Sequence, residues 1–421
     1  MVLLSDSADG GFVSSGGDAA GDVLNSIENL IGSAFSDQLI GSSAANRLEG
    51  GAGNDLLQGN GGADILIGGD GTDTASYSTS GAAVWITLAD TGFGTGVGGD
   101  AQGDLLSSIE NLIGSAFNDL LVGNSGANQM QGGAGNDTFR GGGGADIMLG
   151  GDGIDTADYS TSPGAVWARL YSGTSGSTSQ GADAQGDALL QMENVIGSNF
   201  NDLLHGSEQA NRLEGGAGND TLVGFAGADI LLGGDGFDTA DYSASTAGVN
   251  VGLSATGTTL GAGGDAEGDL LNSIEILIGS AFADQLVGST GDNKLVSGAG
   301  NDTLVGSNGD DLLVANGAGT KMLWGDGTGG VAGEDTFRIL AGTNYIRDYQ
   351  AGEHLELLNL TSINLVGVTI GTTTGLLAGL FSGSTHSTFV ILGTTADIPA
   401  AQAALSYLVN NDLIVDATLI A

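Results

Sequence analysis

Residues Gly50 to Ser76 read GGAGNDLLQ, GNGGADILI and GGDGTDTAS, three copies of a nine-residue unit, Gly-Gly-x-Gly-x-Asp-x-apolar-x. Glycine tolerates positive φ angles and close backbone approach, so the first six residues of each unit predict a tight turn. The last three residues suffice for a very short strand. A carboxylate at the end of such a turn lies beside backbone carbonyls, a set of hard oxygen ligands that suits Ca²⁺. The stretch therefore predicts a calcium-loaded β-solenoid.

The composition of the whole chain agrees with a repeat protein. Its 421 residues include 80 glycines and only 2 prolines, and 40% of them are hydrophobic. Such a chain lacks the collagen period and is too apolar for a simple disordered tract. Glycine at fixed intervals with aliphatic residues between is typical of repeat architectures.

The charge balance excludes some functions and favours another. Lys and Arg total 8 against 50 Asp and Glu, a formal charge of -42, so the chain would repel nucleic acid. The aspartates recur in register rather than in runs, which favours cation binding over mere solubility. The absence of cysteine leaves neither disulfides nor thiolate metal sites. We expect no transmembrane segment, and the N-terminus shows no signal peptide.

A longer period encloses the nonapeptides. The phrase GDVLNSIENLIGS, which begins at Gly21, returns in close variants at Gly103, Gly186 and Gly268, with spacings of 82, 83 and 82 residues. The sequence thus predicts four duplicated modules in an all-β, parallel solenoid. We divide it into a partial N-terminal module (1–22), the repeat array (23–324), a roll-capping segment (325–360) and a mostly-β C-terminal region for assembly or secretion (361–421).

The nonapeptides define the expected calcium ligands. Sixth-position aspartates supply the carboxylates: Asp37, Asp55, Asp64, Asp73, Asp119, Asp137, Asp146, Asp155, Asp202, Asp220, Asp229, Asp238, Asp284, Asp302 and Asp311. Glycines of the turns supply carbonyls: Gly51, Gly53, Gly133, Gly135, Gly216 and Gly218. The second unit of each module carries asparagine at this position: Asn46, Asn128, Asn211 and Asn293. These asparagines are either weaker, neutral ligands or turn residues with positive φ.

Two nonapeptides make one coil, so residues 18 apart should stack. We expect Asp37, Asp55 and Asp73 in one column, with Asn46 and Asp64 on the opposite side. A cation between coils would then take carboxylates from two stacked turns together with carbonyls of the glycine region. The repeats lose register around residues 315–321.

Spacers separate the nonapeptide runs, as between Tyr77 and Asp104. Val84, Ile86 and Leu88 alternate with other residues and predict a strand with one buried face, and LLSSIENLI (105–113) predicts a second strand. The spacers also hold paired aspartates, which are either further ligands or turn formers: Asp18 and Asp22, Asp100 and Asp104, Asp183 and Asp187, Asp265 and Asp269.

The two ends of the chain lie outside the nonapeptide pattern. Residues 1–22 align with the second half of a spacer, with Val2 and Leu4 in the places of Val84 and Ile86, which predicts an open strand edge that needs a partner. Residues 334–360 predict a closing strand pair, and 398–409 a short helix.

These motifs resemble the RTX family of secreted calcium-binding proteins: the nonapeptides, the SIENLIGS phrases, and an end-of-roll unit in DTF…IRDYQAGEHLELL. The resemblance implies a right-handed parallel β-roll, calcium-dependent folding and export by type I machinery that reads an uncleaved C-terminal signal. The last residues, NNDLIVDATLIA, are similar to such signals and equally compatible with an ordinary strand. The repeats also resemble the modules of alginate epimerases, whose catalysis resides in a separate domain.

Sequence motifs of common hydrolases are missing. Neither Gly-x-Ser-x-Gly nor His-Glu-x-x-His occurs, and His205, His354 and His386 are scattered. We therefore expect no enzymatic activity. Three functions remain: a structural subunit that assembles head to tail into a filament or surface layer, a monomeric calcium-binding adhesin or spacer for polysaccharide, and a carrier module for export. The first is our prediction, because an open strand edge and an apolar C-terminal region can pair between chains.

Overall fold

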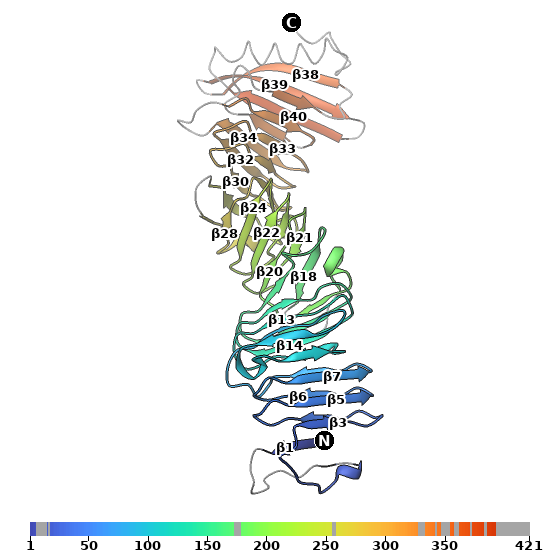
Figure 1. Ribbon diagram of the computed structural model, residues 1–421. Coiled ribbons are helices and arrows are strands. Elements are labelled where there is room, and N and C mark those ends of the chain that lie inside the picture. Colours follow the sequence, from blue (N-terminus) through green and yellow to red (C-terminus); the bar gives the residue numbers. More distant parts are fainter. Residues whose placement is uncertain are drawn as a thin grey trace. The chain divides into compact units, whose positions relative to one another are not determined.

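The computed structural model describes residues 1–5, 15, 17–171, 178–254, 258–326, 333–341, 343–346, 354–357, 362–370, 373–382 and 385–392. Contacts divide the chain into two compact units, Met1–Gly206 and Ser207–Ala421. Each unit is a stack of coils built from short strands (Figure 1).

The first unit carries two mainly parallel sheets. One contains β1 (Val2–Ser5), β4 (Gln38–Ile40), β6 (Leu56–Gln58), β8 (Thr74–Ser76), β12 (Asn111–Ile113), β14 (Gln129–Ala134), β16 (Ile147–Asp152) and β19 (Ala188–Leu190). The other contains β3 (Asn29–Ile31), β5 (Arg47–Ala52), β7 (Ile65–Asp70), β11 (Leu105–Ser107), β10 (Gly94–Val97), β9 (Trp85–Thr87), β13 (Leu120–Val122), β15 (Thr138–Arg140), β17 (Thr156–Asp158) and β20 (Asn194–Ile196). The first unit also contains three more strands, β2 (Leu24–Asn25), β18 (Trp167–Tyr171) and β21 (Leu203–His205). It has three short 3-10 turns, η1 (Gly17–Ala19), η2 (Gly99–Ala101) and η3 (Ala182–Ala184).

The second unit repeats this plan. One of its strand ladders contains β22 (Arg212–Ala217), β24 (Ile230–Asp235), β28 (Leu270–Asn272) and β27 (Thr259–Leu260). A second ladder contains β23 (Thr221–Val223), β25 (Thr239–Asp241), β29 (Ile276–Ile278), β31 (Lys294–Val296), β33 (Leu312–Ala315), β35 (Thr336–Ile339) and β37 (His354–Leu357). A third ladder contains β26 (Asn250–Gly252), β30 (Gln285–Val287), β32 (Asp302–Ser307), β34 (Thr320–Asp326), β36 (Thr343–Ile346), β40 (Thr385–Leu392), β39 (Thr373–Ser382) and β38 (Ser362–Ile370). A 3-10 turn, η4 (Gly264–Ala266), precedes β28.

Apolar residues at the eighth nonapeptide position fill the interior of the coils. Leu39 lies opposite Leu57, and Leu48 lies opposite Leu66, each pair 18 residues apart. All four leucines are buried, as are Phe139 and Met148 in the second module. Side chains alternate between the two faces of a strand, so one apolar residue per unit is enough to build a continuous core. The all-β parallel roll is confirmed, and none of the residues in the ranges above forms an α-helix.

The spacers differ from the prediction in their details. Val84, Ile86 and Leu88 are buried as predicted, but β9 is joined to the antiparallel strand β10 through a turn with Gly92 at φ 82°. Segment 105–113 is two strands rather than one, because the chain crosses at Ser108 from β11, paired with β7, to β12, paired with β8.

Two register assignments are corrected. Val2 pairs with Leu39 as Ile86 pairs with Leu121, so Val2 takes the place of Ile86, not of Val84. A shift of two residues preserves the inward face of a strand, so the burial pattern alone does not reveal it. The loss of register near 315–321 is one inserted residue, after which Leu304 pairs with Leu323.

The C-terminal predictions have mixed outcomes. Instead of a closing strand pair, β35, β36 and β37 continue the parallel stack, each on the strand of the preceding coil. The helix predicted for 398–409 and the terminal segment 410–421 lie outside the described residues.

Candidate metal centres

The sixth-position aspartates stack in columns and are joined by hydrogen bonds. The backbone N–H of Asp37 donates to Oδ1 of Asp55 at 2.7 Å, and that of Asp55 donates to Oδ1 of Asp73 at 2.8 Å. Equivalent bonds link Asp119 to Asp137, Asp137 to Asp155, Asp220 to Asp238 and Asp284 to Asp302. Each carboxylate therefore uses Oδ1 to join its coil to the preceding one and keeps Oδ2 for another partner.

The opposite columns follow the same rule and end on residues of the spacer. The N–H of Asn46 donates to Oδ1 of Asp64, and the N–H of Asp64 donates to Oδ1 of Asp104. The first column likewise ends where the N–H of Asp73 donates to Oε2 of Glu110. The same ends recur at Asp187, Glu193, Asp269 and Glu275. Sequence reasoning missed the glutamates, although a glutamate recurs in every module, in the phrases IEN, IEN, MEN and IEI.

The second oxygen of many column aspartates is buried without a hydrogen-bond donor. This holds for Oδ2 of Asp55, Asp64, Asp73, Asp137, Asp146, Asp155, Asp229, Asp238, Asp311 and Asp335. An ionised carboxylate out of water needs a partner, because its desolvation costs several kcal/mol or more. A cation bound between coils would supply that partner, so these residues fit the calcium ligands predicted from the sequence.

Turn carbonyls converge on the same oxygens. A Cβ built on Gly50 would meet both Oδ2 of Asp55 and the carbonyl oxygen of Gly68, the latter at 2.7 Å, so the two oxygens flank one point. The predicted Gly51 and Gly53 have positive φ, and their carbonyls face Gly69 and Gly71 of the next coil. The carbonyls of Gly133, Gly135, Gly216 and Gly218 face the next coil in the same way. Gly50 and Gly68, which hold the first position of the unit, were not among the ligands expected from the sequence.

The first aspartate of each module has a different environment. In Asp119, Oδ2 accepts the Ser115 N–H, and Oδ1 accepts both the Ser115 hydroxyl and the Val84 N–H, each at 2.8 Å. Asp37, Asp202 and Asp284 receive matching bonds from Ser33, Ser198 and Ser280. These bonds tie the first turn of each module closed from within the protein.

The asparagines bridge protein groups. Oδ1 of Asn128 accepts the Asn124 N–H at 2.9 Å, and its Nδ2 donates to the Glu110 carbonyl at 2.8 Å. Asn46 and Asn293 form the same bridge, and Oδ1 of Asn211 accepts the Ser207 N–H. None of the four has positive φ, so the turn-residue interpretation is wrong in that respect. An uncharged amide joins adjacent turns at the site where a buried carboxylate would need a cation.

Burial also changes the acidity of the columns. Desolvation, the largest cause, raises the pKa of Asp64 and Asp137 to about 7 and that of Asp229 and Asp311 to about 8. Neighbouring carboxylates add to the rise, as Asp104 does at Asp64 and Asp335 does at Asp311. A bound divalent cation would oppose both effects, because it stabilises the ionised form.

The oxygen ligands of these candidate sites suit a hard cation. Within the described ranges no three His, Cys, Asp or Glu side chains gather into one cluster, so each candidate site combines carboxylates with backbone carbonyls. Such all-oxygen sets are the ones that Ca²⁺ accepts, with six to eight ligands in flexible geometry.

The chain matches a family described as RTX calcium-binding nonapeptide repeat (4 copies), over residues 40–75, 107–138, 122–157, 193–222, 205–240 and 278–313. The chain carries RTX calcium-binding nonapeptide repeats. RTX nonapeptides bind several calcium ions, and the repeats place the chain among calcium-binding proteins of the secreted type.

Among solved structures, this RTX-repeat protein is similar to the extracellular lipase LipA from Serratia marcescens, at 20% sequence identity and a TM-score of 0.16. The match covers 49% of this chain and 38% of the lipase. None of the curated proteins compared matches the chain. Among the described residues, no helix has the length and hydrophobicity needed to cross a membrane.

Proposed function

We propose that this RTX-repeat protein is an extracellular, non-catalytic structural protein. Its coils would fold on calcium after export by type I machinery, and the folded chains would assemble end to end into a filament or layer. The exposed hydrophobic edge of the first coil is the observation that carries the assembly part of this proposal.

Calcium-dependent folding follows from the columns. At trace calcium, the buried carboxylates and the net charge of -42 oppose folding, as does the backbone entropy of 80 glycines. Outside the cell, even sites with dissociation constants of about 10⁻⁴ to 10⁻³ M would fill. Each ion bound only by the folded state stabilises it by mass action.

The first coil leaves apolar residues exposed that the equivalent coils bury. Ile27 is 42% exposed, whereas its equivalents Ile109, Met192 and Ile274 are 3%, 2% and 6% exposed. In the described residues, β3 pairs only with β5, whereas its equivalent β12 pairs with both β8 and β14. Such an unpaired edge beside exposed apolar residues is a template for strand addition.

The structure changes which strand would dock. We predicted the edge at the first residues of the chain, but β1 already pairs with β2 and with β4. The open edge belongs instead to β2 and β3, with Ile31 and Phe35 also exposed nearby. A partner would therefore lie against the 24–31 segment.

The complementary surface would come from the C-terminal region of another chain. There β38, β39 and β40 form an antiparallel meander on β36, and among the described strands β38 pairs only with β39. Pairing of two different edges is heterologous and does not close, so it propagates.

Substitution of a charged residue for Ile27 in the first coil tests whether the chains assemble. Electron microscopy of the full chain in millimolar calcium should show filaments or sheets, and in chelator none. Ile27→Lys should abolish them and leave the calcium-induced circular dichroism change intact. Ile154→Lys is the matched control, since Ile154 is 55% exposed but lies in a turn between β16 and β17.

Dispersed particles of the unmodified chain in calcium would contradict assembly and favour the monomeric adhesin or spacer. The exposed Trp85, Phe93 and Phe237 would then be the first candidates for stacking on polysaccharide. A glycan-binding screen in calcium would test that second function.

A further inference from the structure

One coil of the second unit holds a lysine at the position of a column aspartate. Lys321 lies opposite Asp302 in the pairing of β32 with β34, as Asp73 follows Asp55 and Asp155 follows Asp137 in the first unit. The next inward residue, Leu323, is buried at the apolar eighth position. Lys321 therefore occupies the sixth position of its coil, with the opposite charge from the other columns.

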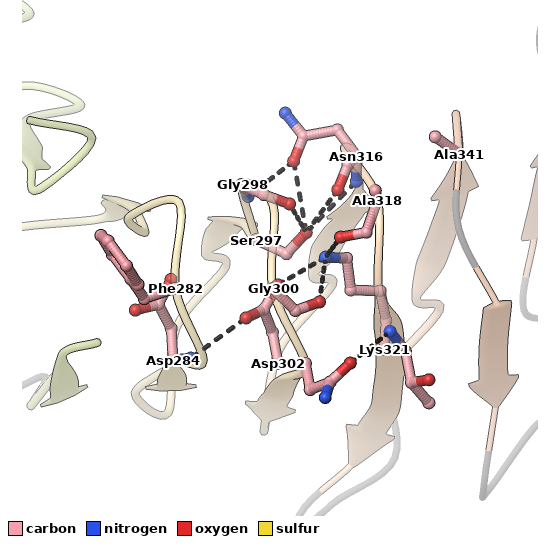
Figure 2. A network of polar contacts seen from close by, with 12 residues as sticks. Phe282, Asp284, Ser297, Gly298, Gly300, Asp302, Asn316, Ala318, Lys321 and Ala341 are labelled. Carbon is pink, nitrogen blue, oxygen red and sulfur yellow. Dashed lines mark hydrogen bonds and ion pairs between the residues drawn. The ribbon is translucent and has the colours of Figure 1, made fainter. Parts of the chain in front are cut away.

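The ammonium group of Lys321 is fully enclosed. The residue is 0% exposed, one of only 8 lysines and arginines in the chain. Its Nζ lies 2.7 Å from Oδ2 of Asp302 and donates to the carbonyls of Gly300 at 2.8 Å and Ala318 at 3.2 Å. Figure 2 shows this network, in which Ser297 and Asn316 close the turn beside it. The three N–H bonds of an ammonium thus meet three oxygen acceptors.

Two of these acceptors match the predicted calcium ligands of other coils. Gly300 and Asp302 hold the fourth and sixth positions of their unit, as Gly53 and Asp55 do in the first module. Oδ2 of Asp55 is buried without a donor, whereas Oδ2 of Asp302 contacts Lys321. The same carboxylate oxygen is left for an ion in one coil and is paired with an ammonium in the other.

We propose that the ammonium of Lys321 replaces a calcium ion in this turn. The charges agree: a dication between two aspartates and an ammonium beside one aspartate both sum to zero. The β32–β34 turn is then closed by the ammonium and takes no ion of its own. The opposite side of the same coils, at Asp311 and Asp335, keeps buried Oδ2 atoms without donors and remains a calcium site.

This inference rests on the assignment of sixth-position aspartates as calcium ligands, and Asp137→Asn tests that assignment separately. The variant should bind fewer calcium ions than the unmodified chain, counted by native mass spectrometry of the full chain in calcium. An unchanged count would refute the ligand assignment itself, whatever Lys321 does.

Lys321→Asp tests the replacement directly. It restores the aspartate of the other columns and should raise the calcium count by one ion per chain. A folded Lys321→Asp chain with the original count overturns the proposal.

A second pair of variants applies even if Lys321→Asp fails to fold. Lys321→Met removes the ammonium and leaves Asp302 buried without its partner, so the melting temperature in calcium should fall by about 5 °C or more. The double variant Asp302→Asn, Lys321→Met removes both charges and should recover most of that loss. Equal melting temperatures for Lys321→Met and the unmodified chain would show that the ammonium does not act as the cation of this turn.

Discussion

The hydroxyl of Tyr77 donates to Oδ2 of Asp104 at 3.0 Å, while Oδ1 of Asp104 accepts the N–H of Asp64. The same pairs recur as Tyr159 with Asp187 and Tyr242 with Asp269. In these columns a protein hydroxyl takes the carboxylate oxygen that the nonapeptide coils leave without a donor. The spacer thus ends an aspartate column with a side chain of its own. Asp104, for which the sequence left open a further ligand or a turn former, is a buried residue that ends its column.

Tyr77→Phe should destabilise the first unit. The change removes a buried hydrogen bond to a carboxylate, which is worth about 1.5–3 kcal/mol. Urea unfolding in saturating calcium should show a lower midpoint with an unchanged slope. In an Asp104→Asn background the same change should cost less, because the charged acceptor is gone. Equal costs in both backgrounds would mean that the hydroxyl acts through packing alone.

Removal of calcium should unfold the roll. With the ions gone, the column carboxylates lose their partners, and mass action no longer favours the folded state. We expect far-UV circular dichroism with little ordered structure in chelator and a cooperative gain of β signal on adding calcium. Magnesium at the same concentration is the control, since it demands a stricter octahedral geometry and gives up water reluctantly. A spectrum that chelator leaves unchanged would refute calcium-dependent folding.

The pH dependence should have opposite signs with and without calcium. Burial raises the pKa of Asp137 to about 7 and that of Asp229 to about 8, from the ordinary 3.8. Without calcium, these groups favour the fold fully below pH 3.8, and that contribution is lost as the pH rises through about 6 to 8. Calcium binds the ionised form, so the calcium concentration at half-folding should fall as the pH rises through the same window.

Circular dichroism titrations at several pH values, in chelator and in calcium, would measure both trends. A calcium midpoint that is constant between pH 6 and 8 would show that protons do not compete at these sites.

Gly50→Ala should disrupt a calcium turn. The new Cβ would collide with Oδ2 of Asp55 and with the carbonyl of Gly68, so the turn must shift at a cost of about 1–3 kcal/mol. Calcium affinity should fall with stability, as measured by the midpoint of calcium-induced folding. Gly81→Ala is the matched control, because a Cβ at Gly81 meets nothing within 4 Å. If both variants behave alike, the close approach at Gly50 is not what requires glycine.

Much of the fold was predictable because the repeat is strict. The 9-residue period identified the inward leucines, and its doubling predicted the columns in which Asp55 bonds Asp73. Local periodicity suffices here because each coil contacts mainly its neighbours. The same argument failed where two registers bury the same face, as at Val2, and where an insertion shifted Lys321 by one residue.

The sequence by itself determined the all-β roll, the positions of the column aspartates and the choice of a hard cation, since these depend on residue type and spacing. Only the tertiary structure decided which carboxylate oxygens lack a protein donor, because many donors come from residues distant in the sequence: Tyr77 at Asp104, Val84 at Asp119 and Lys321 at Asp302. It also showed that the exposed edge belongs to β2 and β3 rather than to β1, because pairing depends on where each strand lies in space. The sequence period shows which residues stack, and the tertiary structure shows which of their carboxylates still need an ion.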